Sequence, residues 1–239
     1  MTSVDPRIGF PRLGTPTEVA LQLANTSIIE QRPLPELIEP AEVVIADPVD
    51  DPLVRVEGYH PRIQVAAHYQ LGGWTNAIGE CWLRSGVASR LGAVADGLPD
   101  PFGLLVYDGW RPRALQAELY LAALSDPAIP PGFLAEPSRD EIRPAPHESG
   151  GAVDLALTVE GVAIAPGTDF DDTTSTSFAA ALENKPGPDR EARRMLYWAM
   201  RSTGFIVYEG EWWHFEFGTR RWAGIVGRSP IFGPAQPPS

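Results

Sequence analysis

Two short segments carry side chains whose types and spacing are suited to chemistry. In the first, residues 146–154, His147 is followed seven positions later by Asp154. The second, about sixty residues downstream, is Glu211–His214, of sequence EWWH. Together they supply two imidazoles, a carboxylate that can join them as a metal ligand, and a second carboxylate. This is the donor set of a catalytic zinc site with an acid or base beside it.

The chemistry that these residues fit is metal-assisted hydrolysis. His147, Asp154 and His214 are the candidate ligands, because a catalytic zinc has about three protein ligands and one position open to water. Two neutral imidazoles and one carboxylate leave the ion with a net positive charge, which lowers the pKa of a bound water and polarises a carbonyl. Glu211 is the candidate general base, which has to lie within hydrogen-bond reach of that water. We therefore predict a zinc peptidase.

Strand geometry restricts where Glu211 can lie. Residues three apart in a regular strand face opposite sides, so Glu211 and His214 cannot serve one site from within the same strand. The alternating aromatic residues of segment 212–217 favour a strand there. We expect Glu211 to belong to the turn at Glu209-Gly210 that precedes the strand, with its carboxylate above the metal. On spacing alone, Glu148 and Glu209 remain alternatives as the base.

Both segments also have purely structural interpretations. A histidine in a globular protein is more often structural than a ligand, the His-to-Asp spacing is common by chance, and the two tryptophans suit a core. The combination favours a site, because the chain has only four histidines and two of them lie in these segments beside acidic residues. His60 and His68 have no comparable neighbours, and we expect them to be structural or surface residues.

Composition limits the class of protein. The 239 residues carry a formal net charge of -12, which argues against nucleic acid or an anionic membrane as a partner, because both attract basic surfaces. Cys81 is the single cysteine, so an intramolecular disulfide and a cysteine-based zinc knuckle are excluded. We find no secretory signal and no apolar run of about eighteen residues, and therefore expect a cytoplasmic protein.

Periodicity predicts the elements that must position the site. A compact apolar run at 102–107 and an alternating segment at 152–157 indicate strands, and Glu160-Gly161 predicts a hairpin turn after the second. The residues from 125 to 146 lack a period and indicate a loop. Further short strands are expected at 43–45, 162–164, 205–208 and 212–217. Helices are expected at 17–25, 76–95, 112–124 and 189–202, the last with Asp189 as its cap.

These elements predict an α+β fold: a small, mainly antiparallel sheet with flanking helices, and zinc in a cleft on one face. Residues 1–60 are rich in proline, which excludes long helices, and are expected to form an arm packed on or extending from the domain. Residues 61–228 are expected to form the catalytic domain. Residues 229–239, rich in proline and glycine, are expected to form a flexible tail.

The motifs resemble those of a known family. The pattern HxxGxAxD at 147–154, the EWWH segment at 211–214 and the sequence YDGWRP at 107–112 occur together in this chain. Their order and gaps are similar to those of VanX-type D-alanyl-D-alanine dipeptidases, over roughly residues 69–222. The resemblance implies the Hedgehog-like fold that this family shares with the other zinc D,D-peptidases.

The resemblance also implies roles for the site residues. The three ligands would hold one zinc ion per chain, and Glu211 would act as general base and then as proton donor to the leaving amine. Arg111, which by itself is best explained as a surface residue near a turn, would stabilise the oxyanion of the tetrahedral intermediate. Asp171 would hold the free amine of a small dipeptide substrate.

Two departures from the family pattern concern the choice of dipeptide. Ala145 stands where the family usually has serine, and the family's Asn-Phe segment is not recognisable in residues 69–76. The leading hypothesis is a dipeptidase for D-Ala-D-Ala or a closely related dipeptide. A D,D-carboxypeptidase acting on peptidoglycan stem peptides is the alternative, disfavoured by the missing signal and by Asp171. A non-catalytic zinc-binding module is disfavoured by the presence of both Glu211 and Arg111.

Overall fold

The computed structural model describes residues 13–40, 48–129, 131–139, 143–229 and 232–238. The strands are β1 (Thr15–Pro16), β2 (Leu53–Arg55), β3 (Ile63–Val65), β4 (Trp82–Arg84), β5 (Phe102–Asp108), β6 (Ala152–Val159), β7 (Val162–Ala165), β8 (Ile206–Val207) and β9 (His214–Glu216). The helices are α1 (Thr17–Leu23), α2 (His68–Leu71), α3 (Ser85–Gly97), α4 (Arg113–Ser125), α5 (Pro188–Ser202) and α6 (Arg220–Val226), with short 3-10 turns η1 (His147–Ser149) and η2 (Ser175–Ser177).

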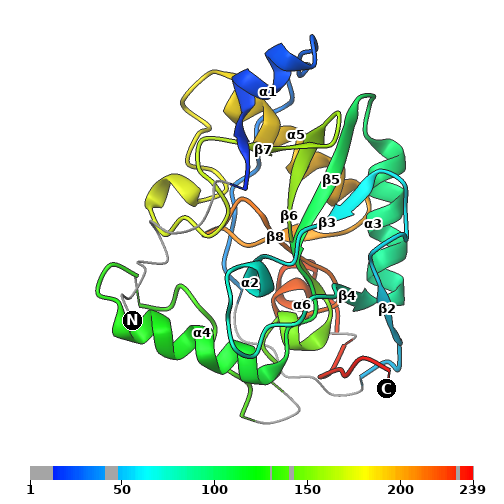
Figure 1. Ribbon diagram of the computed structural model, residues 1–239, viewed down its shortest axis with the longest axis vertical. Helices are drawn as coiled ribbons and strands as arrows, with labels where there is room; N and C mark the ends of the chain where they lie inside the picture. Colours follow the sequence, from blue (N-terminus) through cyan, green and yellow to red (C-terminus); the bar gives the residue numbers. More distant parts are fainter. Residues whose placement is uncertain (1–12, 41–47, 130, 140–142, 230–231, 239) are drawn as a thin grey trace.

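A seven-stranded sheet runs through the centre of the molecule (Figure 1). Its order is β1-β7-β6-β5-β3, and β9 pairs with both β6 and β8. Only the pairings of β1 with β7 and of β3 with β5 are parallel; the other pairings in this sheet are antiparallel. The predicted α+β fold with a mainly antiparallel sheet and flanking helices is thereby confirmed.

Strand β6 is the central strand of this sheet. All of its residues are buried, and it pairs with β5 along one edge and with β7 and β9 along the other. The predicted turn at Glu160-Gly161 is present, with both residues at positive φ, and it returns the chain into β7. Because β6 is fixed on both edges, side chains at its first residues have little freedom to move.

Helices α1, α3 and α5 pack together beside the sheet. Helix α5 contacts α1, α3 and β6, and Figure 1 shows it behind the central strands. Its Leu196 and Met200 are buried in the same core as Leu91 of α3 and Leu155 of β6. Amphipathic helices of this kind gain most of their stability by burying one apolar face against the sheet.

The predicted helix at 76–95 is wrong in its first part. Residues 82–84 form β4, which pairs with β2, and α3 begins only at Ser85. The apolar residues that suggested a helix include Cys81, whose amide donates to Glu57 and whose carbonyl accepts from Val56. These partners lie far away in the sequence, so pairing with a distant strand overrides the local helical spacing. The helix ends at Gly97, two residues beyond the predicted end at residue 95.

The other predicted elements differ from the observed ones mainly in where they begin and end. Helix α5 begins at Pro188 with Gly187 as its cap, so the expected cap at Asp189 is wrong. The strands expected at 205–208 and 212–217 are shortened to β8 and β9. The strands β5 and β6, the helices α1 and α4, and the described parts of the loop after α4 lie where they were predicted. The strand expected at 43–45 lies outside the described residues.

The described part of the N-terminal arm lies against α5 and in the sheets. The backbone amide of Gln31 donates to Glu191, and the carbonyl of Arg32 accepts from the indole of Trp198. The arm also supplies β1 and β2. Within the expected tail, Phe232 is buried and its amide donates to the carbonyl of Gly218. Phe232, at least, is thus held by the domain.

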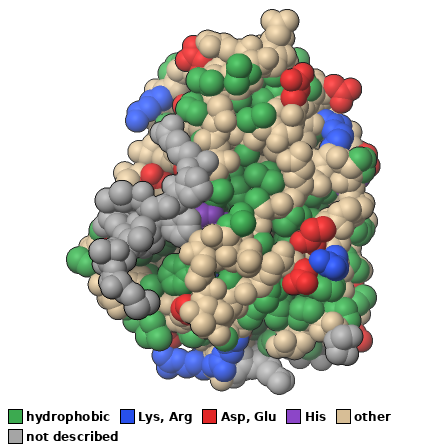
Figure 2. Space-filling view, viewed as in Figure 1, with side chains coloured by type: hydrophobic (Ala, Val, Ile, Leu, Met, Phe, Trp, Pro, Cys, Tyr) green, Lys and Arg blue, Asp and Glu red, His purple; other side chains and the backbone are tan. Residues whose placement is uncertain are grey.

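The surface gives no sign of a broad basic area on the face drawn in Figure 2. Acidic and basic side chains of the described residues lie there in small separate groups. Among the described residues, none of the helices combines the length and the apolar character needed to cross a bilayer.

Candidate active site

The candidate ligands meet because three strands end side by side. The register places Asp108 of β5, Asp154 of β6 and His214 of β9 in one row across the sheet. His147 comes from η1, the single helical turn that precedes β6. Between the two, Gly150 adopts a φ of 71°, in the left-handed region that favours glycine. This turn returns the chain so that His147 lies next to the row.

The three side chains form a buried cluster of metal-ligand dimensions. His147 Nε2 lies 3.2 Å from His214 Nδ1 and 3.3 Å from Asp154 Oδ2. His214 Nδ1 lies 2.9 Å from Asp154 Oδ1. Ligand atoms at zinc–ligand distances of about 2.0–2.1 Å around a tetrahedral ion are separated by about 3.3 Å. The donor atoms are therefore already spaced for one small tetrahedral cation.

The outer nitrogens of both imidazoles are occupied by acceptors. His147 Nδ1 lies 2.7 Å from the carbonyl oxygen of Gly109, and His214 Nε2 lies 3.0 Å from Glu216 Oε1. A carbonyl or carboxylate can only accept, so each outer nitrogen carries the proton. In neutral rings the inner nitrogens would then point lone pairs at one another and at Asp154. Facing lone pairs beside a carboxylate are suited to a cation, and this fits the metal that the sequence predicts.

Glu216 is held as firmly as the imidazole that it contacts. Its carboxylate is fully buried and accepts from Thr219 Oγ1 and from Arg221 Nε, the latter at 3.0 Å. Arg221 in turn donates to Glu39 of the N-terminal arm. Burial by itself would raise the pKa of Glu216, but the hydrogen bond from His214 lowers it. A charged Glu216 therefore fixes the ring of His214 from behind.

The cluster concentrates negative charge. Burial by itself would raise the pKa of Asp154, but the adjacent imidazoles of His147 and His214 hold it well below its usual range. Burial by itself would lower the pKa of His214, but hydrogen bonds to Asp154 and Glu216 raise it to about 10. In the absence of a metal, a proton on His214 balances two buried carboxylates. A divalent cation would take over that balance.

Glu211 lies beside the ligands but outside β9, in the irregular segment that the strand geometry required. Its Oε2 lies 3.8 Å from His214 Nδ1. Burial raises the pKa of Glu211 to about 8, although His214 opposes the shift. The alternatives are placed differently. Glu148 accepts from the amide and hydroxyl of Ser138, and Glu209 is absent from the lining of the cavity that holds the ligands.

Arg111 is buried where β5 leads into α4, and its guanidinium is fixed on three sides. Nε donates to Asp108 Oδ2 at 2.8 Å, Nη1 donates to Gln116 Oε1 at 2.8 Å, and Nη2 lies 3.3 Å from the hydroxyl of Tyr69. Nη2 is also 3.8 Å from Asp154 Oδ2, which brings it to the edge of the ligand cluster. A guanidinium held in this way presents its charge to the cluster without needing to reorient.

Asp171 reaches the same cavity from the acidic loop after β7. It has a positive φ of 60°, which is uncommon for a residue other than glycine and marks a constrained position. Tyr69 donates to its Oδ1 at 3.4 Å, and His68 Nε2 lies 3.8 Å from its Oδ2. Burial, reinforced by the charge of Asp154, raises the pKa of Asp171 to about 7. A cationic group entering the cavity would favour its charged form.

A cavity of about 130 Å³ joins these groups. The three ligands line it with Glu211, Arg111, Asp171, Tyr69, Gln116, Tyr208, Trp213 and Arg221. The structure thus brings all six predicted site residues to one place.

Sequence reasoning did not single out several residues of the site. Tyr69, Gln116 and Arg221 reach it only through the tertiary fold. Glu216 carried a usable signal, because it lies two residues after His214 and strand residues two apart share a face. His68 was expected to be structural or on the surface; it is buried beside Asp171, and burial lowers its pKa to about 4.

A sheet that ends in a buried His-Asp-His set, with a carboxylate and an arginine beside it, is the arrangement of a metal-dependent peptidase. Residues 89–225, more than half of the chain, match the model of peptidase family M15, described as D-ala-D-ala dipeptidase. The chain belongs to this family of metallopeptidases.

Curated relatives carry the same description. The chain is 29% identical over 228 residues to a D-alanyl-D-alanine dipeptidase of Synechocystis, a match that covers 77% of this chain and 90% of the relative. It is 32% identical to a D-alanyl-D-alanine dipeptidase of Escherichia coli over 47% of this chain and 54% of that protein. For a D-alanyl-D-alanine dipeptidase of Enterococcus faecalis the identity is 28%, over 48% of this chain and 62% of the relative.

Two solved structures show partial similarity. The LD-carboxypeptidase LdcB is 17% identical with a TM-score of 0.42, over 85% of this chain and 80% of that one. The D,D-dipeptidase VanXYg, solved with a D-Ala-D-Ala phosphinate analog, is 21% identical with a TM-score of 0.36, over 57% of this chain and 51% of that one.

The contact between Glu216 and His214 predicts a specific effect on metal binding. Glu216→Gln keeps the side-chain shape but removes the charge that holds the ring. The affinity for zinc is expected to fall by about 10- to 100-fold, the range typical for groups that orient a metal-bound imidazole. Competition with a chromophoric chelator measures it. Glu209→Gln, outside the cavity, is the matched control. Unchanged affinity in Glu216→Gln, with an unchanged melting temperature, would contradict the assignment.

Proposed function

We propose that this protein is a zinc-dependent dipeptidase that hydrolyses D-Ala-D-Ala or a closely related dipeptide. The observation that carries the proposal is a single small cavity that joins the His-Asp-His cluster with Glu211, Arg111 and Asp171. Three of the curated relatives are named D-alanyl-D-alanine dipeptidases, which supports this substrate. We assign the activity to residues 61–228, within which all six proposed site residues lie.

Zinc suits the donor set better than the other common divalent ions. Two imidazole nitrogens and one carboxylate are ligands for zinc, whereas magnesium and calcium prefer oxygen donors throughout. His147, Asp154 and His214 would hold the ion. Bound there, zinc would lower the pKa of a water molecule and polarise the carbonyl of the scissile bond.

Glu211 is the proposed general base. Its carboxylate lies 3.8 Å from a ligand nitrogen, so it can reach a water molecule that attacks from the open side of the cluster. It would take the proton from that water and later give it to the leaving amine. The burial that raises the pKa of Glu211 suits a group that must hold the proton between these two steps.

Arg111 is proposed to stabilise the negative charge that develops on the carbonyl oxygen. Its position is set by Asp108 and Gln116 before any substrate arrives. A cation that is fixed in advance stabilises a transition state without paying for its own reorganisation at the moment of reaction. Arg111 is also within 3.8 Å of Asp154, so the oxyanion would form close to the ligands.

Asp171 is proposed to bind the free amine of the substrate. An amine one residue away from the scissile bond is what distinguishes a dipeptide from the end of a longer peptide. The small volume of the cavity agrees with a short substrate. A D,D-carboxypeptidase would have to leave this side open for a stem peptide, and it remains the alternative. A non-catalytic zinc module would require neither Glu211 nor Arg111.

Metal content tests the first part of the proposal. The purified protein is expected to contain about one zinc per chain by elemental analysis, and to lose hydrolysis of D-Ala-D-Ala when treated with a chelator. Addition of zinc should restore the activity, because the ligands are already spaced for the ion. An active protein that contains no metal would contradict the proposal.

Replacement of Glu211 separates metal binding from catalysis. Glu211→Gln is expected to retain zinc while kcat falls by about 100-fold or more, since general acid–base catalysis contributes about that much. Elemental analysis and steady-state kinetics on the same sample measure both quantities. Glu209→Gln and Glu148→Gln are the matched controls. A variant of Glu211 with wild-type turnover would move the role to one of these two residues.

A set of three substrates tests the role of Asp171. The wild-type enzyme is expected to prefer free D-Ala-D-Ala over its N-acetylated form and over a stem pentapeptide that ends in D-Ala-D-Ala. Asp171→Asn should lose most of the preference for the free dipeptide, because it removes the charge that pairs with the amine. Values of kcat/KM for each substrate provide the measurement. Preference for the pentapeptide would favour the D,D-carboxypeptidase.

A further inference from the structure

A free dipeptide carries a charge at each end, and only one end has been accounted for. Asp171 would pair with the amine, but the C-terminal carboxylate also needs a partner once the cavity has excluded water. We propose that Arg221 binds this carboxylate through Nη2 and so makes the enzyme selective for substrates with a free C-terminus. This inference rests on the proposed function, which it extends by a specificity-determining residue.

Arg221 is the cation that remains for this task. Of the residues that line the cavity, Arg111 and Arg221 are the ones with guanidinium groups. The contacts of Arg111 with Asp108, Gln116 and Tyr69 hold its guanidinium in one orientation. Arg111 is moreover placed at the ligand cluster, where the oxyanion would form. The carboxylate at the far end of the substrate therefore requires a different cation.

The guanidinium of Arg221 is oriented but not saturated. Nε donates to Glu216, Nη1 donates to Glu39, and the group lies 4.2 Å from the ring centroid of Tyr208. These contacts hold the plane of the guanidinium on three sides. Among the described residues, none accepts a hydrogen bond from Nη2. One pair of N–H groups is thus available on a side chain that is otherwise fixed, which is the condition for binding an anion without a large entropic cost.

The two ends of the substrate would be recognised by different elements. Asp171 belongs to the loop after β7 and contacts Tyr69, which lies next to Arg111. Arg221 belongs to α6 and contacts Glu216, on the side of His214 that faces away from the ligand cluster. Both residues line the cavity that holds the ligands, so a dipeptide held at both ends would place its single peptide bond beside them.

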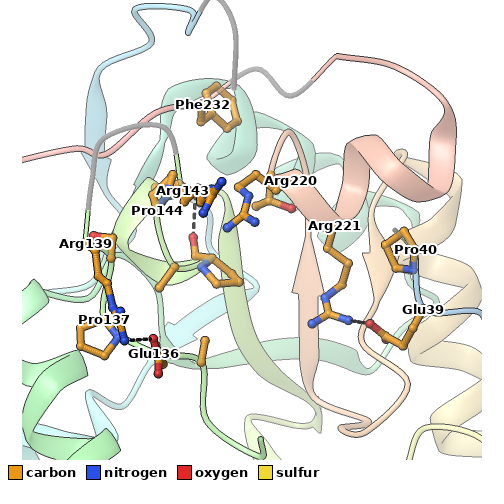
Figure 3. A pocket seen from close by; sticks show the side chains of 16 residues that line it. Glu39, Pro40, Glu136, Pro137, Arg139, Arg143, Pro144, Arg220, Arg221 and Phe232 are labelled. Carbon is orange, nitrogen blue, oxygen red and sulfur yellow. Dashed lines mark hydrogen bonds and ion pairs between the residues drawn. The ribbon is translucent and has the colours of Figure 1, made fainter. Parts of the chain in front are cut away.

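Arg221 also stands where the small cavity meets a wider one. It lines the neighbouring cavity of about 480 Å³ together with Ala135 and Pro146, which border both. Figure 3 shows Arg221 at one side of this wider cavity, turned toward Glu39. A carboxylate at Nη2 would close the substrate site on that side. Glu39 and Glu216 each form an ion pair with Arg221, which offsets their negative charge. A bound divalent ion would add positive charge to the same region.

The test compares D-Ala-D-Ala with its C-terminal amide, D-Ala-D-Ala-NH₂. The two compounds have the same amine and the same scissile bond, and they differ in the charge that Arg221 would bind. The wild-type enzyme is expected to favour the free acid by about 10- to 100-fold in kcat/KM, the range for a hydrogen bond to a charged group. In Arg221→Gln this preference should shrink to about threefold or less, while Arg221→Lys should restore part of it.

The ratio of the two substrates isolates the proposed contact. Loss of the support that Arg221 gives to Glu216 would lower both rates by the same factor and leave the ratio unchanged. Arg220→Gln, a change at the neighbouring residue on α6, should keep the wild-type ratio. A wild-type ratio in Arg221→Gln would overturn this inference alone. If the wild-type enzyme hydrolysed neither compound, the proposed function would be overturned, and the inference with it.

Discussion

The site depends on a carboxylate that the fold places inside the protein. Asp154 is buried near the start of the central strand, where an isolated charge would cost several kcal/mol. The register of β6 with β5 and β9 places His214 on one side of Asp154 and brings Arg111, which follows β5, to the other side. The remaining charges are arranged around this one group, and a divalent ion would complete the balance. The chemistry is thus a consequence of how one strand is paired.

Much of the fold was accessible to sequence reasoning because the signals are local. The alternation of 152–157 and the turn at Glu160-Gly161 are determined by neighbours, and both appear in the structure. The helix expected at 76–95 failed in its first part because β4 takes its hydrogen bonds from β2, some thirty residues earlier. The local spacing of apolar residues contains no information about a strand partner so far away in the sequence. The same holds for Gly187, which caps α5 in place of Asp189.

The site divides in a similar way. The spacing of His147, Asp154 and His214 identifies candidate ligands, and the period of a strand separates Glu211 from them. Tyr69 and Arg221 carry no such mark, since they are ordinary residues in their local sequence and gain a role only from the surfaces that they meet. Residues of a candidate site that lie within sequence motifs are therefore predictable from the sequence. Those that support or border the site are found in the structure.

The pairing of β2 with β4 has a consequence for where this protein can be divided. The match to the family begins at residue 89, yet β2 and β1 come from the arm before residue 61. A fragment that lacked the residues before 61 would leave β4 with an open row of backbone groups and would uncover the edge of β7. Unpaired strand edges of this kind recruit other chains. The arm before residue 61 thus completes both sheets, although it lies outside the family match.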